Sequence, residues 1–127
     1  MAHMAKPQFS VDVKVQYLPE QSRPPDGPFA FAYTVTVRNS GDITAQLVAR
    51  HWIVTDANDQ REDVRGLAVV GKQPVLKPGE HFEYTSWTRI PTPHGAMRGT
   101  FFCMTEDAQA FEAPVAEFAL VYPGALH

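Results

Sequence analysis

Hydrophobic and polar residues alternate along two stretches in the first third of the chain. Between residues 9 and 17 every second side chain is apolar, and residues 29–38 repeat the pattern with aromatic and valine side chains. Because successive side chains of a β-strand point to opposite faces of the sheet, this period of two predicts half-buried antiparallel strands. The proline-rich residues 19–28 between them are predicted to form a loop, and the Asn-Ser-Gly-Asp sequence at 39–42 predicts a hairpin turn.

Shorter segments of the same character continue to the end of the chain. Further strands are predicted at residues 44–55, 61–66, 67–71, 81–87, 97–105 and 111–122. Turn residues separate several of them, and the Lys-Pro-Gly-Glu sequence at 77–80 fits a type II turn, with proline at its first corner and glycine at its second. Eleven prolines disfavour long helices, since each costs about 3 kcal/mol in a helix interior. About seven or eight short strands predict an all-β antiparallel sandwich or small barrel.

Length and composition fit one globular domain. The chain has 127 residues, of which 44% are hydrophobic and 20% are charged, and we interpret residues 1–127 as a single domain. The first four residues, Met-Ala-His-Met, resemble an expression remnant and are excluded from the fold. There is no signal-peptide core and no apolar run of about 18 residues, so we expect a cytoplasmic protein without a membrane partner.

The charge balance limits the kind of partner, and the cysteine content indicates the compartment. Eleven basic and fourteen acidic side chains give a net charge of −3 without a basic cluster, which argues against nucleic-acid binding. The one cysteine, Cys103, rules out an internal disulfide and suits a reducing compartment. It lies within an apolar run, so we expect a buried, unreactive thiol.

Residues 66–73, Gly-Leu-Ala-Val-Val-Gly-Lys-Gln, nearly match a P-loop. That motif requires a serine or threonine directly after Lys72 to hold magnesium, and it requires a helix to begin there. Gln73 occupies the hydroxyl position, and Pro74 disfavours the helical conformation in the residue before it. We therefore do not interpret the segment as a P-loop.

The same segment resembles a dinucleotide-binding fingerprint with one glycine replaced. Ala68 stands at the middle glycine position between Gly66 and Gly71, and no β-α-β unit surrounds it. The main interpretation is a strand bounded by two glycines. The alternative is a weak anion site in which the amides of Gly66 and Gly71 act together with Lys72.

No residue pattern marks a catalytic or metal site. The histidines lack metal-ligand spacing, and no serine lies in a Gly-x-Ser-x-Gly sequence. Ser86, His51 and Asp56 can be combined into a triad, but no motif supports that grouping, and we interpret His51 as a partly buried, hydrogen-bonded ring. We therefore predict no catalytic residues, no metal and no cofactor.

Trp87 is the one aromatic side chain whose position suggests binding. If Phe82, Tyr84 and Ser86 face the core, alternation places Trp87 on the outer face of its strand. Exposed tryptophans are common anchors of protein interfaces. The alternatives are a bulge that turns the ring inward and a loop that covers it.

Three stretches of the chain resemble the ApaG family, also called CorD. They are the sequences at residues 50–58 (Arg-His-Trp-Ile-Val-Thr-Asp-Ala-Asn), at 66–80 and at 82–86. Five single residues downstream fall at matching spacings, namely Thr92, Gly95, Met97, Gly99 and Met104. The resemblance covers residues 9–127.

This resemblance implies a fibronectin type III-like or immunoglobulin-like sandwich. It further implies relatives among F-box proteins and a polymerase-interacting protein, in which the domain serves protein interaction. The bacterial family is linked to cobalt tolerance and magnesium efflux, and its gene neighbours one for a diadenosine tetraphosphatase. The family's triple-glycine motif, associated with pyrophosphate, is matched here by Gly66 and Gly71 but not by Ala68, and Trp87 stands where the family often has glycine.

Taken together, these observations predict a non-enzymatic protein-interaction domain that acts through an open sheet edge or an aromatic face. Its partner is expected to be another protein, and a homodimer formed through exposed edges is compatible with the strand pattern. The alternative function is weak binding of pyrophosphate or a nucleotide by residues 66–72, involving Gly66, Ala68, Gly71 and Lys72.

Overall fold

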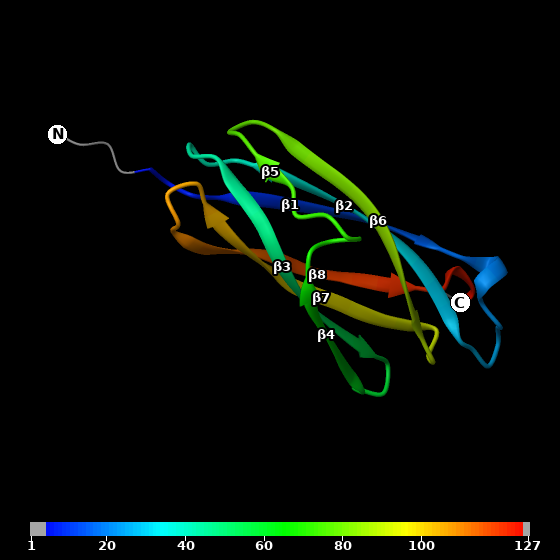
Figure 1. Cartoon of the computed structure of the whole chain (residues 1–127). Coiled ribbons are helices and arrows are strands. Elements are labelled where there is room, and N and C mark those ends of the chain that lie inside the picture. The colour runs from blue at the N-terminus through cyan, green and yellow to red at the C-terminus, as the bar shows by residue number, and fades with distance from the viewer. Residues whose placement is uncertain (1–4, 126–127) are drawn as a thin grey trace.

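The computed structural model describes residues 5–125, and β-strands dominate it from end to end (Figure 1). The eight strands are β1 Phe9–Tyr17, β2 Phe29–Asn39, β3 Ala45–Asp56, β4 Arg61–Leu67, β5 Val75–Leu76, β6 His81–Ile90, β7 His94–Thr105 and β8 Ala110–Val121. Two short 3-10 turns complete the structure, η1 at Pro19–Gln21 and η2 at Pro123–Ala125. The residues interpreted as an expression remnant, 1–4, lie outside the described part of the chain.

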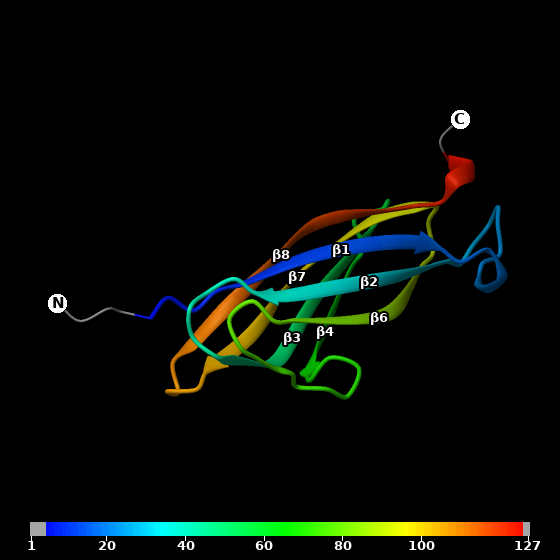
Figure 2. The same cartoon turned by 90° about the horizontal axis from the view of Figure 1, so that it is seen from above.

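The strands form two antiparallel sheets that face each other. One sheet has the order β1-β2-β6, and the other has the order β4-β3-β7-β8, with β5 paired to the end of β3. Figures 1 and 2 show the two sheets as two elongated layers that pack face to face. The predicted all-β sandwich is confirmed, and its architecture is consistent with the fibronectin-like fold that the family resemblance implied.

The two sides of the sandwich differ. On one side β1 of the first sheet contacts β8 of the second, and the rings of Phe9 and Phe111 meet edge to face at 5.4 Å between centroids. On the other side, the edge strands are β6 and β4, and no described strand pairs with the outer edge of either. The sandwich is therefore closed along β1 and β8 and open along β4 and β6.

Aromatic rings fill the space between the sheets. Trp52 of β3 lies at the centre, with ring centroids 5.5 Å from Tyr33 and 5.6 Å from Phe101. Phe31 and Phe101 are fully buried, as the period-two pattern predicts for inward positions. Burying each large apolar side chain of this kind stabilises the fold by about 1.5–3 kcal/mol.

The hairpin predicted at residues 39–42 is wrong. The chain leaves β2 there and crosses to β3 in the opposite sheet, because β2 pairs with β1 and β6 while β3 pairs with β4, β5 and β7. The side chain of Asn39 stabilises this connection between the sheets through three hydrogen bonds. Its amide donates to the carbonyl of Ile43 at 2.9 Å and to that of Leu76 at 2.8 Å, and its Oδ1 accepts from the N–H of Gly41. The turn-forming residues were recognised correctly, but they connect two sheets.

The strand predicted at residues 67–71 is also wrong. After Leu67 the backbone turns tightly, with positive φ at Ala68 (69°), Val70 (42°) and Gly71 (79°). The side chain of Val69 is fully buried, whereas Leu67 and Val70 of the same apolar run are exposed. Burial of this one side chain in the core outweighs the β-propensity of the run, which depends strongly on context.

Other turns agree with the sequence. The type II turn predicted at residues 77–80 is confirmed by a φ of 87° at Gly79 and by a 2.9 Å hydrogen bond from Glu80 N to Lys77 O. The loop predicted at residues 19–28 is irregular apart from η1.

Candidate functional site

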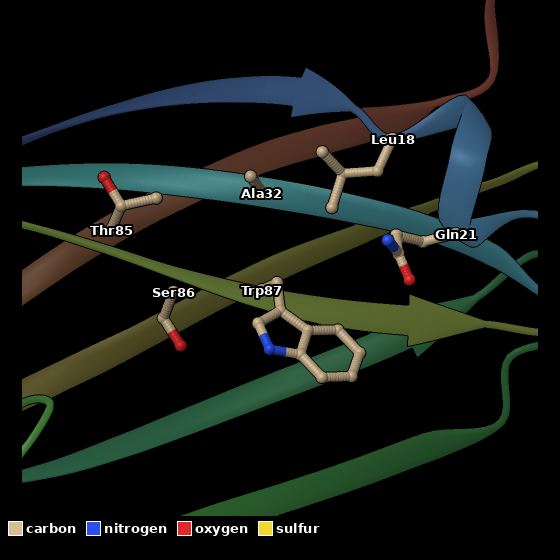
Figure 3. A pocket seen from close by; sticks show the side chains of 6 residues that line it. All are labelled: Leu18, Gln21, Ala32, Thr85, Ser86 and Trp87. Atoms are coloured by element: carbon tan, nitrogen blue, oxygen red, sulfur yellow. The ribbon is translucent and has the colours of Figure 1, made fainter.

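Trp87 lies on the outer face of the β1-β2-β6 sheet. Its side chain is 58% exposed, in agreement with the outward orientation predicted from alternation. It stands opposite Ala32 of β2, whose small side chain leaves room beside the indole. A cavity of about 390 Å³ opens there (Figure 3), lined by Leu18, Gln21, Ala32, Thr85, Ser86 and Trp87.

The surroundings of Trp87 on this face are polar. Thr34 and Thr85 share a 2.8 Å hydrogen bond between their hydroxyls, and Thr36 donates to Glu83 at 3.2 Å. The guanidinium of Arg89 lies 5.4 Å from the centroid of the indole, within range of a cation–π contact. The indole is thus a large apolar group presented from a polar surface and supported by a cation.

Residues 66–72 form a compact turn whose backbone is largely hydrogen-bonded. Val69 and Lys72 exchange two hydrogen bonds, of 2.8 and 2.9 Å, and the amide of Ala68 donates to a carbonyl of β3. The amides of Val70 and Gly71 make no hydrogen bond within residues 5–125. Of the predicted anion-site groups, the structure therefore leaves the Gly71 amide and the exposed Lys72 side chain available.

The turn also holds the side chain of Arg50, a residue that the sequence analysis did not single out. Its Nη1 donates to the carbonyls of Leu67 and Ala68, both at 2.9 Å. A Cβ on Gly66 would lie 2.8 Å from Nη1, so the absence of a side chain at this position leaves room for the guanidinium. The sequence does contain a signal: Arg50 has the same parity in β3 as Trp52 and Val54, which places a charge on the buried face.

A cavity of about 160 Å³ lies beside Arg50, between β6 and the pair β3–β4. Its lining comprises Tyr33, Arg50, Trp52, Val54, Val64, Ser86, Trp87, Thr88 and Met97. A second cavity of about 260 Å³ also touches Val54 and continues between the same strands, lined further by Asp56, Gln60, Arg61, Glu62, Arg89, Ile90 and Pro91. We call these two cavities together the β4–β6 seam.

Two phenol groups lie in the core near Arg50, and one of them, Tyr33, lines the seam. Burial raises the pKa of Tyr33, and this effect outweighs the nearby Ser86 hydroxyl and the Arg50 charge, which both lower it. Burial also raises the pKa of Tyr84, which is only 7% exposed. Tyr84 Oη lies near the Trp52 indole but makes no hydrogen bond of ordinary geometry with the described residues. The seam thus combines the Arg50 cation with the hydroxyl group of the buried Tyr33.

The hypothetical triad of Ser86, His51 and Asp56 is not assembled. His51 Nε2 lies 2.8 Å from Asp63 Oδ2, which confirms the prediction of a partly buried, hydrogen-bonded ring. Asp56 is five positions away on the same strand, so the two side chains point to opposite faces. Its Oδ1 instead accepts hydrogen bonds from two amides of its own turn. Ser86 belongs to the opposite sheet.

Asp63 is the centre of a small surface ion network. Arg61 donates to it from Nε at 2.7 Å and from Nη2 at 2.9 Å, while His51 contacts its Oδ2. These contacts, that of Arg61 first, hold the pKa of the carboxyl well below its usual range. The network lies on the outer face of the larger sheet and fixes the orientation of β4 side chains rather than forming an acid–base pair.

Within residues 5–125 there is no group of three or more histidine, cysteine, aspartate or glutamate side chains that could hold a metal ion. Among the same residues, no helix has the length and hydropathy needed to cross a membrane. Cys103 is buried at 4% exposure, as predicted, and burial raises the pKa of its thiol to about 12.

Comparison with known proteins identifies the family. The ApaG domain model matches residues 19–105, which include strands β2 to β7. The chain belongs to the ApaG family. It is 55% identical to Protein ApaG of Ralstonia nicotianae over 124 residues, covering 98% of this chain and all of that relative. It is 49% identical to Protein ApaG of Dechloromonas aromatica over the full length of both chains.

Solved structures agree with this membership. A crystal structure described as an ApaA protein from Bordetella pertussis superposes with a TM-score of 0.89 at 50% identity, covering 92% of this chain and 95% of the other. The resemblance inferred from residues 50–58 and 66–80 is therefore confirmed. The sandwich that is open along β4 and β6 is thus the fold of an ApaG-family chain.

Proposed function

We propose that this ApaG-family chain is a non-enzymatic protein-interaction domain that binds its partner through the surface around Trp87. The observation that supports this proposal is the 58% exposure of the indole beside a cavity of about 390 Å³. Tryptophan is enriched among the few residues that dominate binding energy at interfaces, because it covers a large area at a small loss of conformational freedom. The adjacent polar face would supply a hydrogen-bonding rim.

The test is affinity capture at native expression level with Trp87→Ala. Phe102→Ala is the matched control, because Phe102 is another exposed aromatic side chain, at 38%, and lies on the larger sheet. A protein recovered with the wild type is then purified, and its affinity is measured by calorimetry. We expect Trp87→Ala to weaken the complex about thirtyfold, as for a hot-spot residue, and Phe102→Ala to leave it unchanged. Equal affinities of both variants for the purified partner would refute the assignment of Trp87.

The second candidate function is weak binding of pyrophosphate or a nucleotide by residues 66–72. Its support is that the amides of Val70 and Gly71 have no partner in the described chain and adjoin Lys72. Titration with pyrophosphate, ATP and diadenosine tetraphosphate, followed by amide chemical shifts, tests it directly. Binding would shift the amides at 70–72 first, and unchanged shifts at millimolar ligand would remove this function.

We further propose that the family's link to cobalt tolerance and magnesium efflux results from binding of a cytoplasmic partner protein. In that case a strain that carries Trp87→Ala in place of the wild-type chain would lose cobalt tolerance, whereas the Phe102→Ala strain would retain it. Unaltered tolerance in both strains, at equal protein levels, would separate the metal phenotype from the Trp87 surface.

A further inference from the structure

The two edge strands of the open side, β4 and β6, differ in the number of charged side chains that they carry. β4 carries four charged side chains among its seven residues, Arg61, Glu62, Asp63 and Arg65, and charges of this kind discourage the addition of another strand. Residues 84–88 of β6, Tyr-Thr-Ser-Trp-Thr, carry no charge. β6 pairs with β2 along one edge only, so its other edge presents free backbone groups toward the seam. The uncharged stretch of β6 is therefore the better site for an added strand.

The charge of Arg50 inside the seam is not neutralised. Its two hydrogen bonds go to carbonyl oxygens, and no carboxylate within residues 5–125 forms a salt bridge with it. Its Nε and Nη2 donors make no hydrogen bond to the described chain. A guanidinium offers paired donors that match the two oxygens of a carboxylate, and such bidentate contacts are stronger than neutral hydrogen bonds. The free donors therefore favour an anionic group in the seam.

The other charges along the seam do not supply that group. Glu62 and Asp56 line the adjoining cavity together with Arg61 and Arg89, rather than the cavity that Arg50 lines. Asp56 Oδ1 is occupied by two backbone amides of its turn. Besides the carbonyls that Arg50 Nη1 already contacts, the cavity is lined by the hydroxyl-bearing side chains of Tyr33, Ser86 and Thr88. This part of the seam is thus positive and can donate hydrogen bonds.

We propose that the β4–β6 seam binds an extended peptide segment of a partner protein, with its backbone added to β6 and an acidic side chain paired with Arg50. This deepens, and rests on, the proposed interaction function, because Trp87 borders the same seam. A strand next to β6 points every second side chain toward the inner face, where the guanidinium lies. A free phosphate would use the cation but leave the backbone of β6 unpaired, so an acidic peptide accounts for both features.

The test compares two blocked peptides of nine residues that alternate threonine and valine and carry either glutamate or glutamine at the centre. Binding to the isotopically labelled full chain is followed through the amides of residues 84–90 and the Nε–H of Arg50. We expect the glutamate peptide to bind about fivefold more tightly than the glutamine peptide and to shift both sets of signals. This comparison requires no variant, so it does not depend on whether a variant folds.

Three variants assign the preference to Arg50. Arg50→Gln should make the two peptides equal, and Gly66→Ala should reduce the preference, because a Cβ 2.8 Å from Nη1 displaces the guanidinium without removing its charge. Arg98→Gln, which removes an exposed arginine on β7, is the matched control and should keep the full preference.

Equal binding of the two peptides by the wild type, or binding that leaves residues 84–90 unshifted, would overturn the proposal. Shifts produced by inorganic phosphate but by neither peptide would overturn it in favour of a phosphate site. If Arg50→Gln leaves a captured partner bound while Trp87→Ala releases it, the seam proposal fails and the interaction function stands.

Discussion

Two non-glycine residues of the turn after β4, Ala68 and Val70, have a left-handed backbone conformation that L-residues adopt rarely. Ala68, at φ 69°, lies between Gly66 and Gly71, and a glycine in its place would relieve backbone strain regardless of any ligand. Val70, at φ 42°, is β-branched and therefore more strained. At this scale the conformations of Ala68, Val70 and Gly71 reflect the shape of the turn, and Gly66 leaves the space for Arg50.

Replacing Val70 by glycine should stabilise the protein. The side chain is 54% exposed, so its loss removes little packing, while glycine adopts φ 42° freely. We expect the free energy of unfolding in urea to rise by about 1 kcal/mol. Val75→Gly is the control, because Val75 is similarly exposed, at 59%, but lies in a strand, where glycine should destabilise. A lower free energy of unfolding in Val70→Gly would show that the left-handed conformation of Val70 does not destabilise the protein.

At the scale of elements, alternation predicted the strands well wherever one face of the strand is buried. β1 and β2 match the predicted ranges within two residues, because Phe9, Phe31 and Val35 mark a single inward face. The pattern failed at Val69, where one buried side chain lies in a turn, and at Asn39, where turn residues join different sheets. Both errors have the same origin: a local pattern does not report which distant strand lies alongside.

The candidate site was only partly predictable for a related reason. The exposure of Trp87 follows from parity within one strand. The seam cannot be predicted from parity within one strand. The cavity beside Arg50 is lined by residues of five strands, which come together only when the two sheets have formed and packed on each other. Arg50 could have been noticed as a charge at an inward position, but its free donors become apparent only when the neighbouring carbonyls are located.

Gly99 of β7 lies opposite Trp52 of β3, where a side chain would be crowded by the partner strand. A Cβ on Gly99 would lie 2.5 Å from His51 O and 2.7 Å from the ring of Trp52. Because a backbone atom and a buried indole cannot move aside easily, Gly99→Ala should lower the free energy of unfolding by about 2–4 kcal/mol. The control is Gly71→Ala, where a Cβ meets no atom within 4 Å and only the φ of 79° imposes about 1 kcal/mol. Equal losses would contradict the assigned crowding at Gly99.

At the scale of the whole molecule, the core is held between two sheets that contact each other mainly through side chains. Cys103 of β7 lies in that core at 4% exposure, and burial raises the pKa of its thiol to about 12. Near neutral pH the folded protein therefore presents a protonated and inaccessible thiol, whereas unfolding restores an ordinary cysteine.

Alkylation of Cys103 should consequently report opening of the sandwich. At pH 8 we expect iodoacetamide to modify the native protein at least about a hundredfold more slowly than the urea-unfolded protein, with rates followed by mass spectrometry. The rate should rise with urea in parallel with the loss of the β-sheet signal in circular dichroism. Rapid modification of a chain that retains its full β-sheet signal would show that the thiol is reached without separating the sheets.

The contact between β1 and β8, which closes one side of the sandwich, joins the first and the last of the described strands and so sets an order for biosynthesis. Among the described strands a ribosome releases β1 first and β8 last, so the apolar face of Val11 and Val13 lacks its neighbour until β8 has emerged. The β1–β2 hairpin can form early, but its inner surface is covered only after β3, β7 and β8 of the opposite sheet have been added. Nascent chains stalled before β8 are consequently expected to remain bound by chaperones, whereas chains that include β8 are released.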